Sequence, residues 1–295
     1  MRKSIGIKIS RNFFYPEAFA YQKYLAKFDY GVKLIKHKND LKKYDIIIKF
    51  MGLDFNINQK NKIIIHDYAS LSTGKLAKIK NKIKKNFNIR PNARIFLNKT
   101  VRDEMNFNDN IPFIYRDMGI DKEFFFKTSI KKKYDILYCG TFKNRPGLIN
   151  IIRDLANKKL SIVLIGDISN KQKAELCDIK NIKILGKIPR ELIYQIYYET
   201  RVGLNFYPNI YPYNIQTSTK VLEYFAAGMG VISNSYEWIN KFEYKLDCKI
   251  LYYNKLLSKE KILHFDYKKP NLKNYEWNKY LASINFEKFI DSLII

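Results

Sequence analysis

The residue types that could do chemistry are concentrated between positions 216 and 234, in a stretch with helical spacing. Glu223 is the one acidic residue of this stretch, and its carboxylate can accept hydrogen bonds from two hydroxyl groups of a ligand. Polar or basic residues precede it, where backbone N–H groups at the start of a helix attract an anion such as a diphosphate. These residues are Gln216, Thr217, Ser218, Thr219 and Lys220. The segment therefore predicts a site for a ligand that carries hydroxyl groups and phosphate.

A second group of candidate residues follows two predicted strands in the middle of the chain. Lysine and arginine between a strand and a helix can neutralise a diphosphate and stabilise the negative charge of a leaving group. The alternative interpretation is a basic loop whose side chains are solvated. The residues concerned are Gly140, Thr141, Lys143, Arg145 and Gly166.

The elements that must position these residues alternate between strands and helices along the chain. Short apolar stretches predict strands at 4–10, 44–50, 62–66, 94–97, 134–139, 160–165, 182–185, 202–206 and 230–233. Apolar residues at helical spacing predict helices at 15–28, 76–87, 148–157, 190–199, 219–227 and 275–292. Such alternation favours parallel sheets that are covered by helices on both faces.

The length and this alternation predict an α/β protein with two facing Rossmann-like domains and a cleft between them. We place the first domain at residues 1–125 and the second at residues 126–274. The last segment, 275–295, is expected to be a helix that crosses back to the first domain. Ligands of open parallel sheets bind at the carboxyl ends of the strands, so the candidate residues are expected at the cleft.

The stretch from Gln216 to Asn234 resembles the donor-binding segment of GT-B glycosyltransferases, particularly the family 4-like group. There, a helix containing Leu-Glu-Tyr and ending in Ala-Ala-Gly leads into a Val-Ile strand. The resemblance implies that residues 1–125 form the acceptor-side domain and that residues 126–274 bind the nucleotide-sugar. It implies that Glu223 holds the ribose hydroxyls of a nucleoside diphosphate sugar. It also implies that Lys143 and Arg145 bind the diphosphate, although their spacing is displaced from the usual one. The residues from Tyr115 to Phe124 resemble the segment that closes the first domain in this family.

In the first domain the resemblance is carried by His66, which is followed by Asp67 and small hydroxylic residues. It implies that His66 contacts the donor sugar or orients the acceptor, and that Asp67 binds or deprotonates an acceptor hydroxyl. A capping or buried structural histidine is the alternative.

Two departures from familiar patterns bear on the mechanism. Many retaining family 4 enzymes carry a second glutamate eight positions before the ribose-binding one, where this chain has Ile215, flanked by Asn214 and Gln216. Retention is expected by resemblance only, and the donor sugar stays open. The chain has no Asp-x-Asp sequence, and basic side chains can supply the electrostatic role of a metal. We therefore expect no essential metal and no cofactor beyond the donor, for which a UDP-sugar is the first expectation.

Composition bears on the compartment of the protein and on the kind of partner that it binds. The three cysteines lack metal-site spacing, no stretch is long enough to span a bilayer, and we expect a cytoplasmic protein. The formal net charge of +26 suits an anionic partner, although an AT-rich genome would also enrich lysine. Residues 75–85 contain six lysines and no acidic residue. Such a helix can lie on the inner face of an anionic membrane, or can pack on its sheet with solvated lysines.

We therefore expect a glycosyltransferase that moves a sugar from a nucleoside diphosphate sugar to a glycan or lipid-linked acceptor, in synthesis of cell-surface polysaccharide or lipopolysaccharide. One alternative is a basic nucleic-acid-binding protein that stacks bases on its 23 tyrosines and 20 phenylalanines, though no known nucleic-acid-binding motif occurs. Another is a non-catalytic GT-B relative that serves as the partner of an active enzyme.

Overall fold

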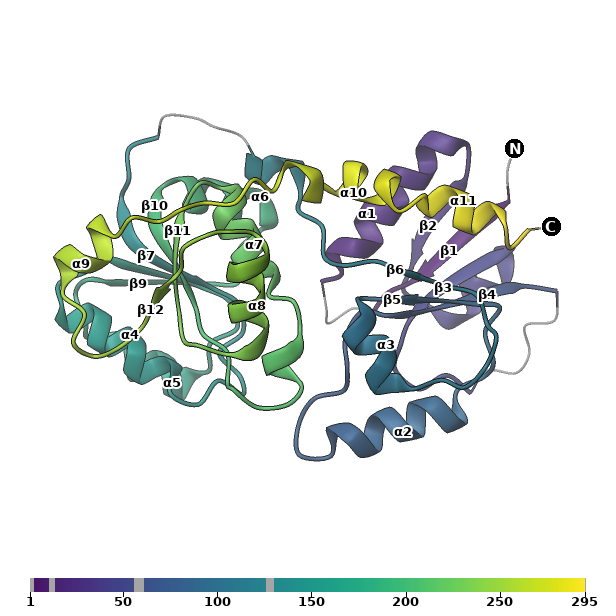
Figure 1. Ribbon diagram of the computed structural model, residues 1–295, viewed down its shortest axis with the longest axis horizontal. Coiled ribbons are helices and arrows are strands. Elements are labelled where there is room, and N and C mark those ends of the chain that lie inside the picture. Colours follow the sequence, from purple (N-terminus) through teal and green to yellow (C-terminus); the bar gives the residue numbers. More distant parts are fainter. Residues whose placement is uncertain (1–2, 11–13, 56–60, 126–129, 295) are drawn as a thin grey trace. The chain divides into compact units, whose positions relative to one another are not determined.

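A computed structural model describes residues 3–10, 14–55, 61–125 and 130–294. The chain divides into two compact units, of which the first comprises Met1–Gly119 with Tyr275–Ile295 and the second Ile120–Asn274. In the first unit six strands form a parallel sheet in the order β2-β1-β3-β4-β5-β6 (Figure 1). These strands are β1 (Ser4–Lys8), β2 (Gly31–Ile35), β3 (Ile46–Phe50), β4 (Ile63–Tyr68), β5 (Ala93–Phe96) and β6 (Phe113–Tyr115).

Helices cover both faces of this sheet, as a parallel sheet requires. Figure 1 shows α1, α10 and α11 on one side of the strands and α2 and α3 on the other. Because both faces are covered, the central strand β3 has three consecutive isoleucines, Ile46 to Ile48, without exposed surface. The helices are α1 (Pro16–Leu25), α2 (Ala77–Phe87), α3 (Lys99–Met105), α10 (Trp277–Ser283) and α11 (Phe286–Asp291).

The first unit contains three elements that the apolar pattern did not predict, namely β2, α3 and β6. All three are short, and α3 begins at a capping residue, Asn98, whose side chain accepts a hydrogen bond from the N–H of Val101. The single helix predicted at 275–292 is two helices. Asn285 lies between them with a φ of 51°, a left-handed conformation that ends a helical run.

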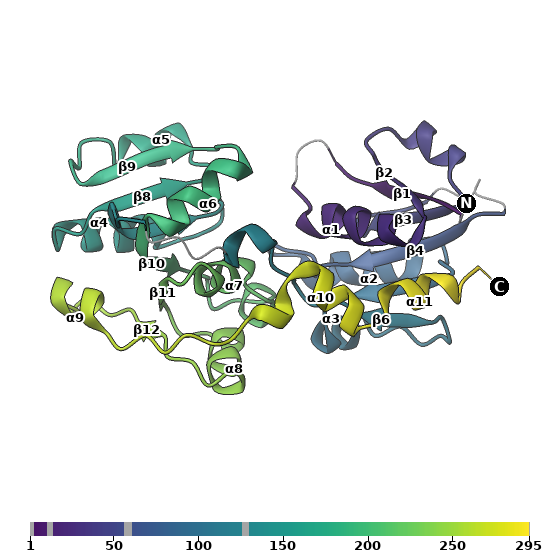
Figure 2. The same cartoon turned by 90° about the horizontal axis from the view of Figure 1, so that it is seen from above.

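The second unit contains another six-stranded parallel sheet, in the order β12-β11-β10-β7-β8-β9. Figure 2 shows its strands from above, with α4 and α6 near them. The strands are β7 (Tyr134–Cys139), β8 (Ile162–Ile165), β9 (Ile182–Gly186), β10 (Thr200–Asn205), β11 (Gly230–Ser233) and β12 (Leu251–Tyr252). The helices are α4 (Leu148–Asn157), α5 (Asn170–Ala174), α6 (Arg190–Tyr198), α7 (Thr219–Ala226), α8 (Glu237–Lys245) and α9 (Lys259–His264).

The direction of the connections in the second unit fixes where a ligand can bind. From β7 the chain proceeds through β8 to β9 on one side, and from β10 through β11 to β12 on the other. The strand order thus reverses between β7 and β10, which pair directly. In open α/β sheets the crevice at the carboxyl ends of two such strands is the usual ligand site, because their loops diverge there. The residues after Cys139 and Asn205 border this crevice.

Candidate functional site

Lys220 lies in the first turn of α7 with 9% of its surface exposed. Its ammonium lies 4.5 Å from the ring centre of Tyr138 and 4.8 Å from that of Tyr207. Within the described part of the chain, no hydrogen-bond acceptor or carboxylate is paired with this ammonium. Burial and the nearby charge of Arg145 together lower the pKa of Lys220 to about 7, although the charge of Glu223 opposes them. A buried cation without a counter-ion is costly, so this position suits an anionic ligand.

Arg145 supplies a second cation to the same place. Its guanidinium carbon lies 4.4 Å from the ring centre of Tyr207 and 4.6 Å from that of Tyr213, so the two rings fix the plane of the guanidinium. The Nε atom of Arg145 is buried without a hydrogen-bond partner. Lys220 and Arg145 therefore share the ring of Tyr207, and together they form a doubly charged site at the carboxyl end of β7.

The other predicted cation, Lys143, is not part of this pair. Its side chain is exposed and lines a surface pocket of about 660 Å³ together with Arg145, Ser169 and Lys171. The backbone N–H of Lys143 donates to Oγ1 of Thr141 at 3.2 Å, so Thr141 shapes the loop. The sequence could not separate the two cations, because their different burial depends on how the loop folds.

Two glycines allow the loops around the site to approach each other. A β-carbon on Gly166 would lie 1.8 Å from the carbonyl oxygen of Gly140, which no side chain can tolerate. Gly140 and Gly166 have φ values of +148° and +136°. A β-carbon on Gly140 would lie 3.4 Å from Nζ of Lys220, so the backbone comes close to the ammonium.

The start of α7 has the polar character that the sequence predicted. Ser218 is the N-cap, but its hydroxyl donates to Asn205 Oδ1 at 3.0 Å and does not cap the helix. Thr219 follows as the first helical residue, and Thr217 precedes the cap. The side-chain nitrogen of Gln216 is buried without a hydrogen-bond partner, as is the side-chain oxygen of Asn214. First-turn N–H groups thus lie beside buried polar atoms that a ligand could satisfy.

Glu223 lies one turn after Lys220 on the same helix and is 7% exposed. Its Oε1 accepts a hydrogen bond from Nη2 of Arg190 at 2.8 Å, and its Oε2 accepts one from the hydroxyl of Tyr197 at 3.1 Å. Burial raises the pKa of Glu223, and the charge of Arg190 opposes that rise. The carboxylate is therefore held in a fixed orientation.

Arg190 is a charged residue of this site that the sequence analysis missed, as it missed the tyrosines around Lys220, Arg145 and Glu223. It is the first residue of α6, directly after the loop that follows β9, and its Nε donates to Oδ2 of Asp121 at 2.7 Å. Tyr194 donates to the same oxygen at 3.0 Å. A signal was present, because Arg190 follows Pro189 near the carboxyl end of a predicted strand, where ligand-binding residues gather.

In the first unit, His66 on β4 is fully buried. Its Nε2 lies 3.4 Å from Oδ2 of Asp54, which also accepts a hydrogen bond from Nζ of Lys49 at 2.6 Å. Neither ring nitrogen forms a hydrogen bond of good geometry within the described residues. Burial lowers the pKa of His66, so its neutral form is favoured. The ring of His66 therefore belongs to a buried polar cluster with Asp54 and Lys49.

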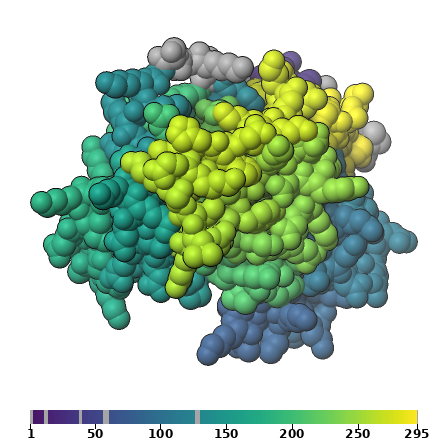
Figure 3. All heavy atoms as spheres, turned by 60° about the vertical axis from the view of Figure 1, so that its left-hand side comes forward, coloured from purple at the N-terminus to yellow at the C-terminus, as the bar shows by residue number. Residues whose placement is uncertain are grey.

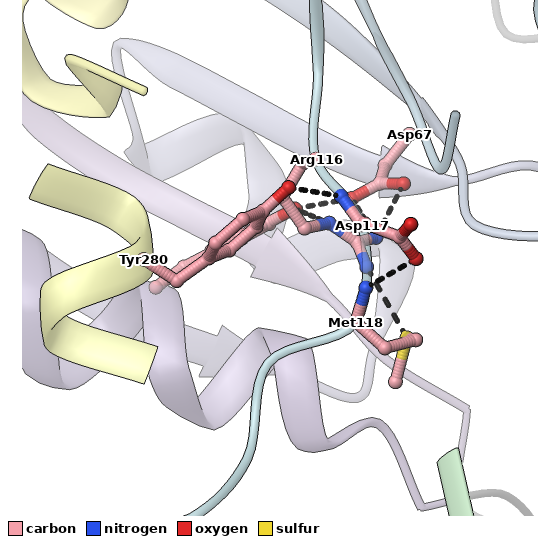
Figure 4. A network of polar contacts seen from close by, with 6 residues as sticks. Asp67, Arg116, Asp117, Met118 and Tyr280 are labelled. Atoms are coloured by element: carbon pink, nitrogen blue, oxygen red, sulfur yellow. Dashed lines mark hydrogen bonds and ion pairs between the residues drawn. The ribbon is translucent and has the colours of Figure 1, made fainter. Parts of the chain in front are cut away.

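Asp67 is also fully buried, and both of its oxygens have partners (Figure 4). Nη2 of Arg116 donates to them at 2.9 and 3.0 Å, and the hydroxyl of Tyr21 donates to Oδ2 at 2.7 Å. Arg116 Nε in turn donates to the Tyr21 hydroxyl at 2.6 Å. Asp67 thus belongs to a fully buried network with Arg116 and Tyr21.

Neither a family model nor a curated protein matches the chain. Solved structures do match. AviGT4, a glycosyltransferase involved in avilamycin A biosynthesis, is 10% identical over 99% of this chain and 98% of its own, with a TM-score of 0.64. HepE of Anabaena, in complex with UDP and glucose, is 10% identical over 99% of this chain and 91% of its own, with a TM-score of 0.58.

UDP-GlcNAc 2-epimerase of Neisseria meningitidis, bound to UDP-GlcNAc, is 10% identical over 98% of this chain and 100% of its own, with a TM-score of 0.56. These similarities span nearly the whole chain, and the two parallel six-stranded sheets with flanking helices match the neighbours. The predicted α/β GT-B fold is therefore confirmed. At this level of identity the likeness concerns the fold, which glycosyltransferases and epimerases share.

Proposed function

We propose that this protein is a glycosyltransferase that takes its sugar from a nucleoside diphosphate sugar. The observation that carries the proposal is the ammonium of Lys220, which forms no ion pair with the described residues and lies beside Arg145, at the point where the strand order reverses. A diphosphate would neutralise both cations and accept hydrogen bonds from the first turn of α7. Neighbours of the same fold are described as complexes with UDP and glucose and with UDP-GlcNAc, which favours a UDP-sugar.

In this proposal each group has a defined part in the reaction. Lys220 and Arg145 bind the diphosphate and stabilise the charge that develops on it as the bond to the sugar breaks. Glu223, oriented by Arg190 and Tyr197, accepts hydrogen bonds from the ribose hydroxyls. Because two cations are already supplied by the protein, we propose that the reaction needs no metal. We propose that His66, which is fully buried, stabilises the carboxyl end of β4 through its contact with Asp54.

The acceptor side of the proposal rests on α2. Four apolar side chains at helical spacing are exposed there: Leu76 by 57%, Ile79 by 55%, Ile83 by 37% and Phe87 by 63%. The face that packs on the unit contains Ala77 and Asn81 instead. In Figure 3 the blue segment that includes α2 lies on the surface at the lower edge of the view. The helix therefore does not bury its apolar stripe against the sheet, contrary to the second of the two interpretations of its sequence.

An exposed apolar stripe flanked by lysines suits the surface of an anionic membrane. Each basic residue near such a surface contributes about 1 kcal/mol to binding. We therefore propose peripheral contact with the inner face of the membrane, a lipid-linked acceptor and a retaining reaction in cell-surface polysaccharide synthesis. None of the helices in the described part of the chain has the length and apolar character needed to cross a bilayer.

Calorimetry with UDP, GDP, ADP and CMP tests the donor site. We expect one nucleoside diphosphate to bind the wild type at micromolar strength and to bind Arg145→Ala and Lys220→Met at least tenfold more weakly. Lys171→Ala removes an exposed lysine from the neighbouring pocket and serves as the matched control, with unchanged binding expected. Absence of nucleotide binding together with tight, salt-sensitive RNA binding would exclude the transferase and favour a nucleic-acid-binding protein.

The reaction itself is tested by following the sugar of the bound donor. Transfer to an added glycan or lipid-linked acceptor, with release of nucleoside diphosphate, is the expected result. Conversion of UDP-GlcNAc to its 2-epimer without any acceptor would assign the protein to the other activity found on this fold. Nucleotide binding without either reaction, in the presence of an extract that contains acceptors, would indicate a non-catalytic partner subunit.

A further inference from the structure

A second concave site lies in the first unit and contains none of the residues proposed to bind the donor. It is a pocket of about 330 Å³ at the C-terminal end of α2, bordered by the chain between α2 and β5 and by residues 107–109. Four basic residues line it, and one acidic residue does. The basic residues are Lys84, Lys85, Arg90 and Arg94, and the acidic residue is Asp109.

The single carboxylate of the pocket is already neutralised. Both Nη atoms of Arg94 donate to Asp109, at 2.6 and 2.8 Å, and the guanidinium lies 3.7 Å from the ring centre of Phe107. Arg94 is 5% exposed, and its Nε is buried without a hydrogen-bond partner. The guanidinium is thus fixed in place while one of its donors remains unused within the described residues.

The three remaining cations give the pocket a positive excess. In the described part of the chain, Lys85 and Arg90 have neither a hydrogen bond nor an ion pair through their side chains. Lys84 donates to the carbonyl of Met51 at 3.1 Å, and burial lowers its pKa. Unpaired cations around a fixed arginine suit a compact oxyanion, and arginine binds phosphate oxygens with two parallel hydrogen bonds.

The position of the pocket indicates where that phosphate would come from. Lys84, Lys85 and Asn86 of α2 line the pocket, and the exposed Ile83 and Phe87 lie on either side of them in the sequence. A lipid bound here could place its phosphate among the cations and its acyl chains beside the apolar stripe. We propose that this pocket binds the phosphate of an anionic phospholipid headgroup when α2 lies on the membrane.

This inference rests on the proposed membrane contact and names the lipid group that the contact recognises. It differs from general attraction to negative charge, because it requires a phosphate and it requires Lys85 and Arg90 in particular. Lysines elsewhere on the helix would contribute equally to binding of a surface that carries phosphate and of one that carries another anionic group. The distinction can be measured with vesicles of equal surface charge but different charged groups.

The test is co-sedimentation with phosphatidylcholine vesicles that carry either phosphatidylglycerol or oleate at matched charge. We expect the wild type to prefer phosphatidylglycerol, and the double variant Lys85→Ala/Arg90→Ala to lose this preference with about 30-fold weaker binding. The matched control Lys75→Ala/Lys82→Ala removes two exposed lysines from the other end and middle of the same segment. It should bind both vesicle types more weakly but retain the preference.

Equal losses in the two double variants on both vesicle types would overturn the proposal, as would a wild type without preference. Calorimetry with soluble glycerol phosphate distinguishes the source of the phosphate. Binding of glycerol phosphate without any vesicle binding would assign the pocket to a free phosphate ester and overturn the lipid proposal. UDP binding, measured on the same samples, should be equal in all variants because the donor site lies in the second unit. Its absence in the wild type would contradict the transferase proposal, not the lipid site.

Discussion

Replacement of Lys220 by methionine should make the protein more stable and unable to bind its donor. Lys220 is 9% exposed and forms no ion pair with the described residues, and its pKa is lowered from the ordinary 10.5 to about 7. That difference corresponds to about 5 kcal/mol, at about 1.4 kcal/mol for each pH unit. Methionine has a similar shape and can pack against the rings of Tyr138 and Tyr207 without this penalty. We therefore expect Lys220→Met to raise the free energy of unfolding by several kcal/mol at pH 6.

The sign of the pH dependence follows from the protons that each state binds. The unfolded chain keeps the proton of Lys220 up to about pH 10.5, whereas the folded protein releases it near pH 7. Between these values the unfolded state binds more protons, so the stability of the wild type rises with pH relative to the variant. The advantage of Lys220→Met should be constant below pH 7 and shrink by about 1.4 kcal/mol per pH unit above it.

Urea denaturation of both proteins at pH 6, 7, 8 and 9 measures this difference in stability. Calorimetry at pH 7 to 9 measures the affinity for UDP. UDP needs the charged amine, so its affinity for the wild type should fall by up to tenfold per unit above pH 7. A variant that is less stable than the wild type at pH 6 would refute the reasoning. So would a stability difference that does not change with pH, or UDP binding that survives the substitution.

Three further predictions concern the remaining groups of the two units. Asp67→Asn breaks a fully buried ion pair with Arg116 and should lower the free energy of unfolding by about 4 kcal/mol in urea denaturation. An unchanged free energy of unfolding would contradict the stabilising role of this pair. Arg190→Ala leaves the carboxylate of Glu223 buried without its cation, and should lower the free energy of unfolding by about 3 kcal/mol and weaken UDP binding in calorimetry. Arg190→Lys should recover part of both losses. Dialysis against EDTA should leave the transfer rate unchanged in a turnover assay, and a rate restored only by added Mg²⁺ would contradict the metal-independent proposal.

The fold could be predicted largely because its strongest elements have simple patterns. Ile46 to Ile48 form a continuous apolar run, as is typical of a strand covered on both faces, and α4 repeats apolar residues at helical spacing. The elements that were missed have no such pattern. The strand β6 has three residues, of which Phe113 is 39% exposed. Its pairing with β5 stabilises it, and that pairing is not visible in the local sequence.

The candidate site divides in a similar way between what local sequence can and cannot predict. Glu223 and Lys220 are one turn apart on α7, so a helical pattern places them together without knowledge of the rest of the chain. Arg145 and Lys143 are two residues apart in a loop, and the rings of Tyr207 and Tyr213 contact Arg145 while Lys143 stays exposed. Those rings come from a segment about 60 residues later in the sequence. No local rule could select Arg145.

The same reasoning explains why the side chains of His66 and Asp67, although adjacent, have different partners. Successive residues of a strand point to opposite faces of the sheet. Asp67 therefore meets Tyr21 of α1 and Arg116, whereas His66 faces Asp54 and Lys49. In the second unit the candidate residues follow the ends of their strands, so their side chains can converge on one ligand.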